Sequence, residues 1–226
     1  MNFHIITIFP EVIEKYFRVG IMGRAQIEEK IKVNTYDLRG YSKDKHRKVD
    51  DTPYGGGPGM VMSVQPIVDC IVDIKEKIKQ TEPQISDNEI RIVLLAAKGE
   101  KFNQKKAVQY RDFKHLILIC GRYEGVDERI AEHLIDEEIS TGEYILSGGE
   151  LPAMTVIDAI SRLIPGVLGN EKSLDSESFN GDGFEADFPV YTKPEKFGEW
   201  EVPKVLLSGN HKEIEEWRNK KRISQR

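Results

Sequence analysis

Apolar residues in the first half of the chain recur with the periods of strands and helices in turn. Residues 3–9 are mostly β-branched or aromatic and stop at Pro10, which predicts a buried strand. A helix is predicted from Pro10, since proline is tolerated in the first helical turn. Its apolar face carries Val12, Ile13, Tyr16 and Phe17. A second strand is predicted over residues 31–38, and the polar stretch 39–59 holds too little apolar surface for core structure.

The middle of the chain continues this alternation. Helical spacing returns over residues 64–78, where apolar residues lie three or four apart at Ile67, Val68, Ile71, Ile74 and Ile78. Two near-continuous apolar runs, 90–97 and 115–120, are typical of strands covered on both faces in a parallel sheet. A polar helical stretch around residues 102–110 separates them. The pattern therefore predicts an α/β fold.

The last third of the chain changes in composition. A helix is predicted from Pro152 to just before Pro165. Residues 171–187 then hold six carboxylates against one lysine, which predicts a mobile linker. Another helix is predicted at 211–222, whose cationic end suits the helix dipole. The expected organisation is a large domain at 1–166, a mobile acidic linker at 167–188 and a small, mostly helical domain at 189–226.

Charge and cysteine content narrow the classes of protein. The 33 Lys and Arg against 38 Asp and Glu give a net charge of −5, which excludes a basic nucleic-acid-binding coat but not a local basic patch. Cys70 and Cys120 are too few for a disulfide framework or a four-cysteine zinc site, and are expected to be reduced core thiols. The apolar runs are too short to span a membrane, and the first residues lack a signal-peptide pattern. A soluble cytoplasmic protein is expected.

Three segments are rich in glycine and polar residues: 53–60, 121–129 and 140–150. Loops that follow strands are where open α/β sheets bind ligands. Four glycines in the first segment let the backbone approach a flat base or a phosphate, but the Lys-Ser/Thr pair of a P-loop is absent. The third offers backbone donors and acceptors suited to an adenine edge. Each segment alone also fits an ordinary turn or a solvated loop with surface salt bridges.

A short basic run is the other candidate binding feature. Four cations and a histidine fall within six residues, at Lys43, Lys45, His46, Arg47 and Lys48. Such a run is ordinarily a solvated loop, but on an acidic protein it is also where a phosphate backbone would bind. The histidines show no metal-ligand spacing, so the sequence assigns no metal site and leaves the use of a divalent ion open.

Five motifs occur in order at residues 53–60, 121–129, 142–150, 164–169 and 206–211, the last reading Leu-Leu-Ser-Gly-Asn-His. Together they resemble the family of bacterial tRNA guanine-N1 methyltransferases that modify position 37. The resemblance implies a SPOUT-type parallel sheet with a deep trefoil knot and S-adenosylmethionine as the methyl donor, held in a bent pose. It also implies tRNA as the substrate, and a homodimer with its active sites at the subunit interface.

The resemblance also assigns residues to roles. The methyl donor is expected among three loops, which contribute Leu94, Leu95, Ala96, Gly121, Tyr123, Glu124, Gly125, Thr141, Gly142, Glu143, Tyr144, Ile145, Leu146, Gly148, Gly149 and Pro152. Charge, and not the resemblance, places the tRNA at the basic run, Lys43, Lys45, His46, Arg47 and Lys48. In the first donor loop the chain reads Leu-Leu-Ala-Ala-Lys-Gly, where family members often have Leu-Ser-Pro-Gln-Gly.

Two further residues are expected to be catalytic. Arg162 matches the arginine that the family uses near the target guanine. The family's catalytic aspartate lies in an acidic stretch before Ser-Phe, and counting back from Ser178-Phe179 places Glu177 at its position. Asp175 stays an alternative, because a flexible linker lets either carboxylate reach the target. Guanine N1 is a poor nucleophile until its proton leaves, so a carboxylate is needed as the base.

Two alternative functions stay open at this point. One is a SPOUT-like RNA methyltransferase that acts on another atom, such as a ribose hydroxyl. The other is an RNA-binding protein of the same fold that has lost catalysis, an idea favoured by the glutamate at position 177. Transfer of a labelled methyl group separates the second from an enzyme, and base-only and ribose-only substrate analogues separate the first.

Overall fold

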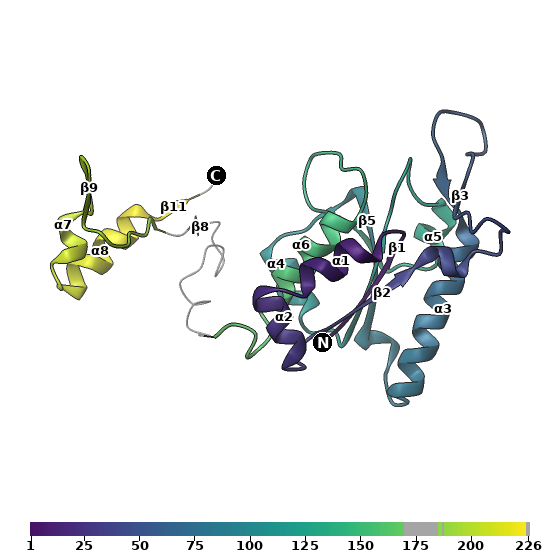
Figure 1. Cartoon of the computed structure of the whole chain (residues 1–226), viewed down its shortest axis with the longest axis horizontal. Helices are drawn as coiled ribbons and strands as arrows, with labels where there is room; N and C mark the ends of the chain where they lie inside the picture. Colours follow the sequence, from purple (N-terminus) through teal and green to yellow (C-terminus); the bar gives the residue numbers. More distant parts are fainter. Residues whose placement is uncertain (170–184, 187, 225–226) are drawn as a thin grey trace. The chain divides into compact units, whose positions relative to one another are not determined.

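The computed structural model describes residues 1–169, 185–186 and 188–224. The chain divides into two compact units, Met1–Gly169 and Asn170–Arg226. Figure 1 labels their elements along the chain. The elements of the first unit are β1 (Asn2–Thr7), α1 (Pro10–Phe17), α2 (Gly20–Ile27), β2 (Lys32–Asp37), the 3-10 helix η1 (Leu38–Tyr41), β3 (Asp50–Asp51), β4 (Val61–Met62), α3 (Val64–Thr81), the 3-10 helix η2 (Asp87–Glu89), β5 (Ile90–Lys101), α4 (Gln104–Tyr110), β6 (His115–Cys120), α5 (Glu128–His133), β7 (Glu137–Ser140) and α6 (Glu150–Ser161).

The first unit is built on a five-stranded sheet in the order β2-β1-β6-β5-β7. Every neighbouring pair is parallel, with β1 paired to β2 from Asn2↔Lys32 and to β6 from Asn2↔His115. This confirms the predicted α/β fold with a parallel sheet. Because all five strands run the same way, their carboxyl ends lie along one edge, where the connecting loops can form a ligand site.

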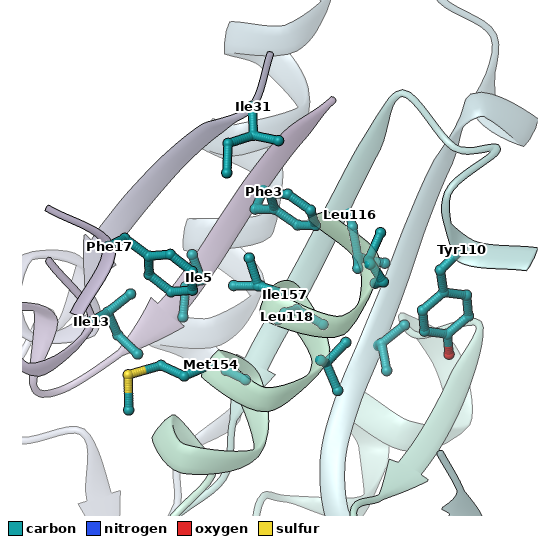
Figure 2. Close-up of a cluster of buried hydrophobic side chains, with 14 of the residues drawn as sticks. Phe3, Ile5, Ile13, Phe17, Ile31, Tyr110, Leu116, Leu118, Met154 and Ile157 are labelled. Atoms are coloured by element: carbon teal, nitrogen blue, oxygen red, sulfur yellow. The ribbon is translucent and has the colours of Figure 1, made fainter. Parts of the chain in front are cut away.

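Helices cover both faces of this sheet, as the near-continuous apolar strands predicted. Alternate residues of β6 point to opposite faces. Leu116 and Leu118 join a buried cluster with residues of α1, α2, α4 and α6, part of which is drawn in Figure 2. Ile117 and Ile119 join a second cluster with α3 and α5. Both cysteines are buried and unpaired in these clusters, as predicted.

The first helix buries a narrower stripe than its sequence predicts. Ile13 and Phe17 are buried, but Val12 and Tyr16 are 42% and 44% exposed, so the expected four-residue core face is wrong for two of them. The Tyr16 hydroxyl instead donates a hydrogen bond of 2.6 Å to Asp158 of α6. A helix lying in a layer beside a second helix touches the sheet along one line only, which leaves its flanks at the surface.

Several element boundaries also differ from the predicted ones. Strand β5 runs on to Lys101 instead of ending near residue 97, and α6 begins at Glu150, two residues before Pro152. The stretch 39–59 was expected to lie outside the core, yet Val49 is buried in it, because β3 pairs with β4 and carries the chain back to the second cluster. Helix α2 and strand β7 were not predicted, since each has few apolar residues in a helical or strand pattern.

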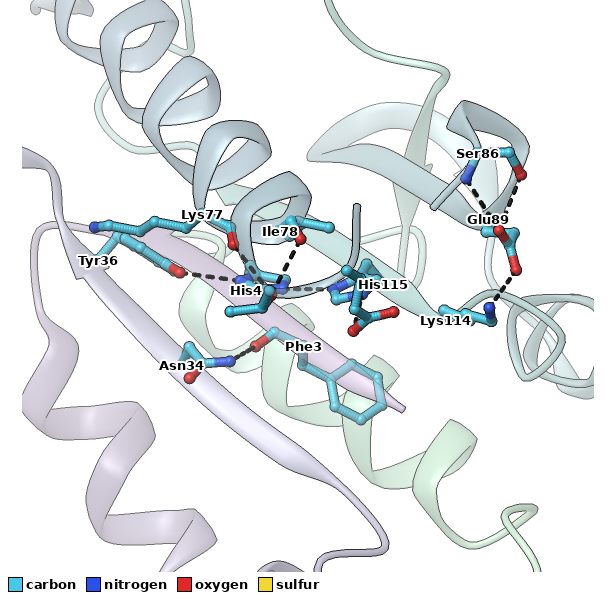
Figure 3. A network of polar contacts seen from close by, with 12 residues as sticks. Phe3, His4, Asn34, Tyr36, Lys77, Ile78, Ser86, Glu89, Lys114 and His115 are labelled. Atoms are coloured by element: carbon cyan, nitrogen blue, oxygen red, sulfur yellow. Dashed lines mark hydrogen bonds and ion pairs between the residues drawn. The ribbon is translucent and has the colours of Figure 1, made fainter. Parts of the chain in front are cut away.

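A buried polar network on the sheet face that α3 covers runs from His115, the first residue of β6, through His4 of β1 to Tyr36 of β2 (Figure 3). His4 contacts the Tyr36 hydroxyl through Nδ1 and His115 Nδ1 through Nε2, both at 3.0 Å. His115 Nε2 lies 3.1 Å from Glu82. Burial, together with His115, lowers the pKa of His4 to about 3, so His4 is neutral at neutral pH. This network joins β1, β2 and β6 and takes no part in the site described below.

The described part of the second unit is small. Its elements are β8 (Glu185–Ala186), β9 (Lys196–Phe197), β10 (Trp200–Glu201), α7 (Lys204–Leu207), α8 (His211–Lys221) and β11 (Ile223–Ser224). Helix α8 confirms the helix predicted at 211–222. Most of the linker expected at 167–188 falls outside the described residues, so the linker and the three domain boundaries stay predictions. Among the described residues, no helix is both long and apolar enough to cross a membrane.

Candidate functional site

A cavity of about 540 Å³ opens at the carboxyl ends of β6 and β7, beside a bulge within β5. This bulge and the loops after β6 and β7 line the cavity, together with Pro152 in the first turn of α6. Fourteen of the sixteen residues expected to hold the methyl donor lie in its wall, all but Gly142 and Glu143. The parallel sheet is what brings these loops together, although up to 58 residues separate them in the sequence.

The first wall is a bulge in β5. Leu95 and Glu100 both pair with Ile139 of β7, so residues 96–99 loop out of the sheet between them. Gly99 closes this bulge, since a Cβ there would lie 2.5 Å from the backbone nitrogen of Ile139. The bulge turns Ala96, Ala97 and Lys98 toward the cavity. Bulges often re-aim side chains next to sites in this way.

The second wall follows β6 and is tied to the first glycine-rich segment. Tyr123 adopts a positive φ of 61° and Gly125 one of 135°, which turns the chain sharply. The Met62 amide donates to the Gly125 carbonyl at 2.9 Å, and the Glu124 amide donates to the Met60 carbonyl at 3.0 Å. Segment 53–60 therefore lies beside the cavity at its Met60 end. Gly59 faces the Glu124 side chain, which a Cβ at this position would displace.

The third wall is fastened to the second by the backbone. The Gly149 amide donates to the Gly121 carbonyl at 2.9 Å, and Gly148 forms a bridge with Arg122. A Cβ on Gly149 would lie 2.7 Å from Cys120 Cα, so this close approach requires glycine. Gly142 instead packs against the Tyr144 ring, and Glu143 forms an ion pair of 2.5 Å with Lys101. Those contacts explain why both stay out of the cavity wall.

A largely buried ion pair at the cavity wall joins loops that are far apart in the sequence. Arg122 Nη2 and Nε lie 2.9 and 3.0 Å from one oxygen of Glu150. The other Glu150 oxygen accepts a hydrogen bond of 2.8 Å from the Thr7 hydroxyl. The Arg122 guanidinium also lies 4.5 Å from the centre of the Phe9 ring. The pair therefore holds the ends of β1 and β6 and the start of α6 in one arrangement.

Sequence reasoning missed Arg122 and Glu150 as a pair, and it also missed three charged residues of the cavity wall, Lys98, Glu128 and Glu138. The glycine-rich segments that contain Arg122 and Glu150 were the available signal. No spacing in the sequence indicates which two charges of such segments meet. The Cys120 thiol lies beside this pair, and burial raises its pKa well above the usual value, so it stays protonated.

The other predicted site residues lie elsewhere. Arg162 follows the last residue of α6, is half-buried and does not line the cavity. Glu177 and Asp175 lie outside the described residues. The basic run is exposed in a loop that Asp44 shapes by accepting hydrogen bonds from the amides of His46 and Lys48. These two backbone hydrogen bonds lower the pKa of Asp44.

Within the described ranges, no group of three or more His, Cys, Asp and Glu side chains is placed to hold a metal ion. The cavity therefore offers glycine-flanked backbone, apolar side chains and a few charges as its binding groups. Fold and site together define an α/β protein with a small-molecule cavity at the carboxyl edge of a parallel sheet.

Comparison with known proteins narrows this class. The whole chain, residues 1–226, matches the family described as tRNA (Guanine-1)-methyltransferase TrmD. It is 48% identical to a tRNA (guanine-N(1)-)-methyltransferase of Ruminiclostridium cellulolyticum, over 96% of this chain and 89% of the relative. Proteins of the same name from Alkaliphilus metalliredigens and Staphylococcus aureus are each 46% identical, over 99% of this chain and 87% and 86% of their own lengths. The chain belongs to this family, which confirms the resemblance found in its motifs.

Proposed function

We propose that this protein is a tRNA guanine-N1 methyltransferase that transfers the methyl group of S-adenosylmethionine to N1 of guanosine 37 of tRNA. Family membership over the whole chain carries the proposal. The relatives named above, which are called tRNA (guanine-N(1)-)-methyltransferases, support it over nearly their full length. The three-loop cavity also supports it, because its glycine-rich loops offer a place for the donor.

The residues of the cavity suit S-adenosylmethionine. Its volume of about 540 Å³ is in the range of small-molecule sites. Leu94, Ile145 and Leu146 give apolar surface for a flat base. When bound, the donor supplies an activated methyl group. The protein's own part is then to orient the donor and the target and to manage the proton on N1.

We assign the role of the base to Glu177, the position found by counting back from the Ser178-Phe179 motif. Its carboxylate takes the N1 proton as the new bond to the methyl carbon forms. Negative charge then develops on guanine O6, where the Arg162 guanidinium stabilises it. A linker that orders on tRNA binding brings the base to the target only when the substrate is present. Asp175 is the alternative base within the same linker.

The test is a transfer assay with methyl-labelled donor on tRNA that carries guanosine or another nucleoside at position 37. We expect label in tRNA only when guanosine is present, and we expect it at N1 after digestion to nucleosides. Label on a ribose, or label that is independent of guanosine 37, would replace this function by another RNA methylation. If the protein bound tRNA but transferred no methyl group, it would be an RNA-binding protein and not a methyltransferase.

The basic run is the proposed tRNA contact of the first unit. Replacing Lys45 and Arg47 with glutamine should flatten the slope of log affinity against log salt concentration by about one to two, because each lost phosphate contact releases one fewer counterion. Affinity is measured by filter binding at four salt concentrations. Lys79→Gln with Lys105→Gln, two exposed charges on helices α3 and α4, is the matched control. An unchanged slope in the Lys45 and Arg47 variant would show that the basic run is an ordinary solvated loop that does not contact tRNA.

A homodimer with shared active sites is part of the proposal. Chains with Glu177→Ala lack the base and chains with Gly121→Val lack the donor pocket, so each homodimer should be inactive. If base and pocket come from different subunits, a mixed dimer regains one complete site. Equal mixing should then restore about a quarter of wild-type activity, since half the dimers are mixed and half their sites are complete. Circular dichroism checks that both chains fold, and inactive mixtures of folded chains contradict the shared site.

The SPOUT-type knot and the cytoplasmic location complete the proposal. Family membership is what supports the knot, since knots are rare exceptions to chain topology. The cytoplasm is where tRNA is modified and used in bacteria, and the two buried, unpaired cysteines agree with a reducing compartment.

A further inference from the structure

A mostly buried lysine outside the cavity contacts both strands that meet at the β5 bulge. Lys106 is the third residue of α4, and its side chain is 9% exposed. Its Nζ lies 2.8 Å from a carboxylate oxygen of Glu100 on β5 and 2.6 Å from one of Glu137 on β7. Burial disfavours the charge of Lys106, but its hydrogen bonds to both carboxylates raise its pKa, so the lysine is charged at neutral pH. The Asn103 side chain fixes the start of α4 by accepting a hydrogen bond of 3.0 Å from the Lys106 amide.

The two carboxylates lie on either side of the bulge in the pairing of β5 with β7. Glu137 pairs with a residue of β5 ahead of the bulge, and Glu100 pairs with Ile139 directly after it. Lys106 therefore joins the point where β5 re-enters the sheet to the part of β7 that pairs ahead of the bulge. The loop between, residues 96–99, forms the first wall of the cavity. A change in where β5 resumes pairing would move this wall, since a slip of one residue turns side chains to the opposite face.

Two other lysines beside the bulge form more exposed ion pairs. Lys98 reaches Glu138 of β7, and Lys101 reaches Glu143 in the loop after β7. The side chains of these two lysines are 56% and 62% exposed, and exposed pairs contribute little because water screens them. A mostly buried cation between two carboxylates is screened less. Lys106 is therefore the stronger side-chain anchor of the bulge.

We propose that Lys106 is a positioning residue for the methyl donor, a proposal that rests on the proposed function. The lysine sets where β5 resumes pairing, and so it places the bulge that faces the donor. Removal of its charge leaves no carboxylate buried without a partner. Glu137 keeps Arg91, whose Nε lies 2.9 Å from its other oxygen, and Glu100 is 71% exposed and turns to solvent. The loss should therefore act on the bulge more than on the stability of the whole unit.

Lys106→Met tests the proposal, because methionine has a similar length and no charge. We expect it to weaken binding of S-adenosylhomocysteine, the donor without its methyl group, about tenfold by calorimetry, since a displaced wall no longer fits the ligand. In methyl transfer, the KM for the donor should rise by a similar factor, while the KM for tRNA should change by less than about twofold. A merely structural defect would instead lower the fraction of active enzyme, and with it kcat, and leave both KM values unchanged. Lys106→Arg, which keeps the cation, should bind the ligand as the wild type does.

Arg91→Met is the matched control. Arg91 contacts the same carboxylate, Glu137, but lies on β5 ahead of the bulge, so its loss should affect stability and leave ligand binding within about twofold of wild type. Glu100→Gln removes the charge of the other carboxylate at an exposed position and should weaken binding in the same direction as Lys106→Met. Combined with Lys106→Met it should add little, because both substitutions break one contact.

Urea unfolding checks that each variant is folded. Unchanged ligand binding in folded Lys106→Met overturns the proposal, and so does an equal loss in Arg91→Met, or a fall in kcat with the donor KM unchanged. If Lys106→Met does not fold, Glu100→Gln decides in its place, and unchanged binding there overturns the proposal. A wild-type protein that neither bound S-adenosylhomocysteine nor methylated tRNA would instead contradict the proposed function.

Discussion

Glu177→Gln should lower single-turnover methyl transfer to tRNA by about 10²–10⁴-fold, the usual scale for loss of a general base. Glutamine keeps the shape of the side chain but cannot accept the N1 proton. Donor binding should change little, because this carboxylate is not part of the donor pocket. The measurement is transfer of a labelled methyl group under single-turnover conditions, with donor binding measured in parallel by calorimetry.

Two further variants test whether Glu177 or Asp175 is the base. Asp175→Asn should cost far less than Glu177→Gln, and Glu177→Asp, which restores the family's own residue, should stay active. Near-normal transfer by Glu177→Gln together with collapse in Asp175→Asn would move the base to Asp175. Normal transfer by both would remove the linker carboxylates from the mechanism and direct attention to other acids, Glu124 among them, which lines the cavity and is exposed.

Glu150→Ala should lower the free energy of unfolding by about 3 kcal/mol, at the lower end of the cost of breaking a buried ion pair. The substitution leaves Arg122 beside the cavity without its carboxylate and removes the acceptor of the Thr7 hydroxyl. Donor binding should also weaken, since the pair aligns two of the three cavity loops. The measurement is urea unfolding of the full chain, followed by circular dichroism.

An exposed pair is the control for this prediction. Arg18→Ala removes the partner of Glu14 just after α1, where the Arg18 side chain is 73% exposed, and should cost about 0.5 kcal/mol or less. Arg122→Ala should resemble Glu150→Ala in stability, because each leaves the other charge unpaired. A Glu150→Ala protein as stable as the Arg18→Ala protein would show that the buried pair contributes no more than a surface pair.

Much of the fold could be predicted from the sequence because its signals are local. Strand β6 consists of six buried residues, four of them branched aliphatics, and helix α3 repeats isoleucine at helical spacing, so burial and period agree over their whole length. Strand β7 could not be predicted in this way. Its sequence is Glu-Glu-Ile-Ser, and it is a strand because β5 offers it a pairing edge and Ile139 a place in the core.

The candidate site, like the fold, was predicted in part from the sequence. The sequence by itself determined the family, the glycine-rich loops and most of the donor-cavity residues, because glycines and motifs are readable without knowing what they touch. Only the tertiary structure decided that Arg122 meets Glu150 and Thr7, and that Lys98 meets Glu128 and Glu138. It also turned Gly142 and Glu143 away from the cavity. Which charges meet depends on how the strands are ordered in the sheet and where β5 bulges, and these are long-range properties that no local pattern of residues carries.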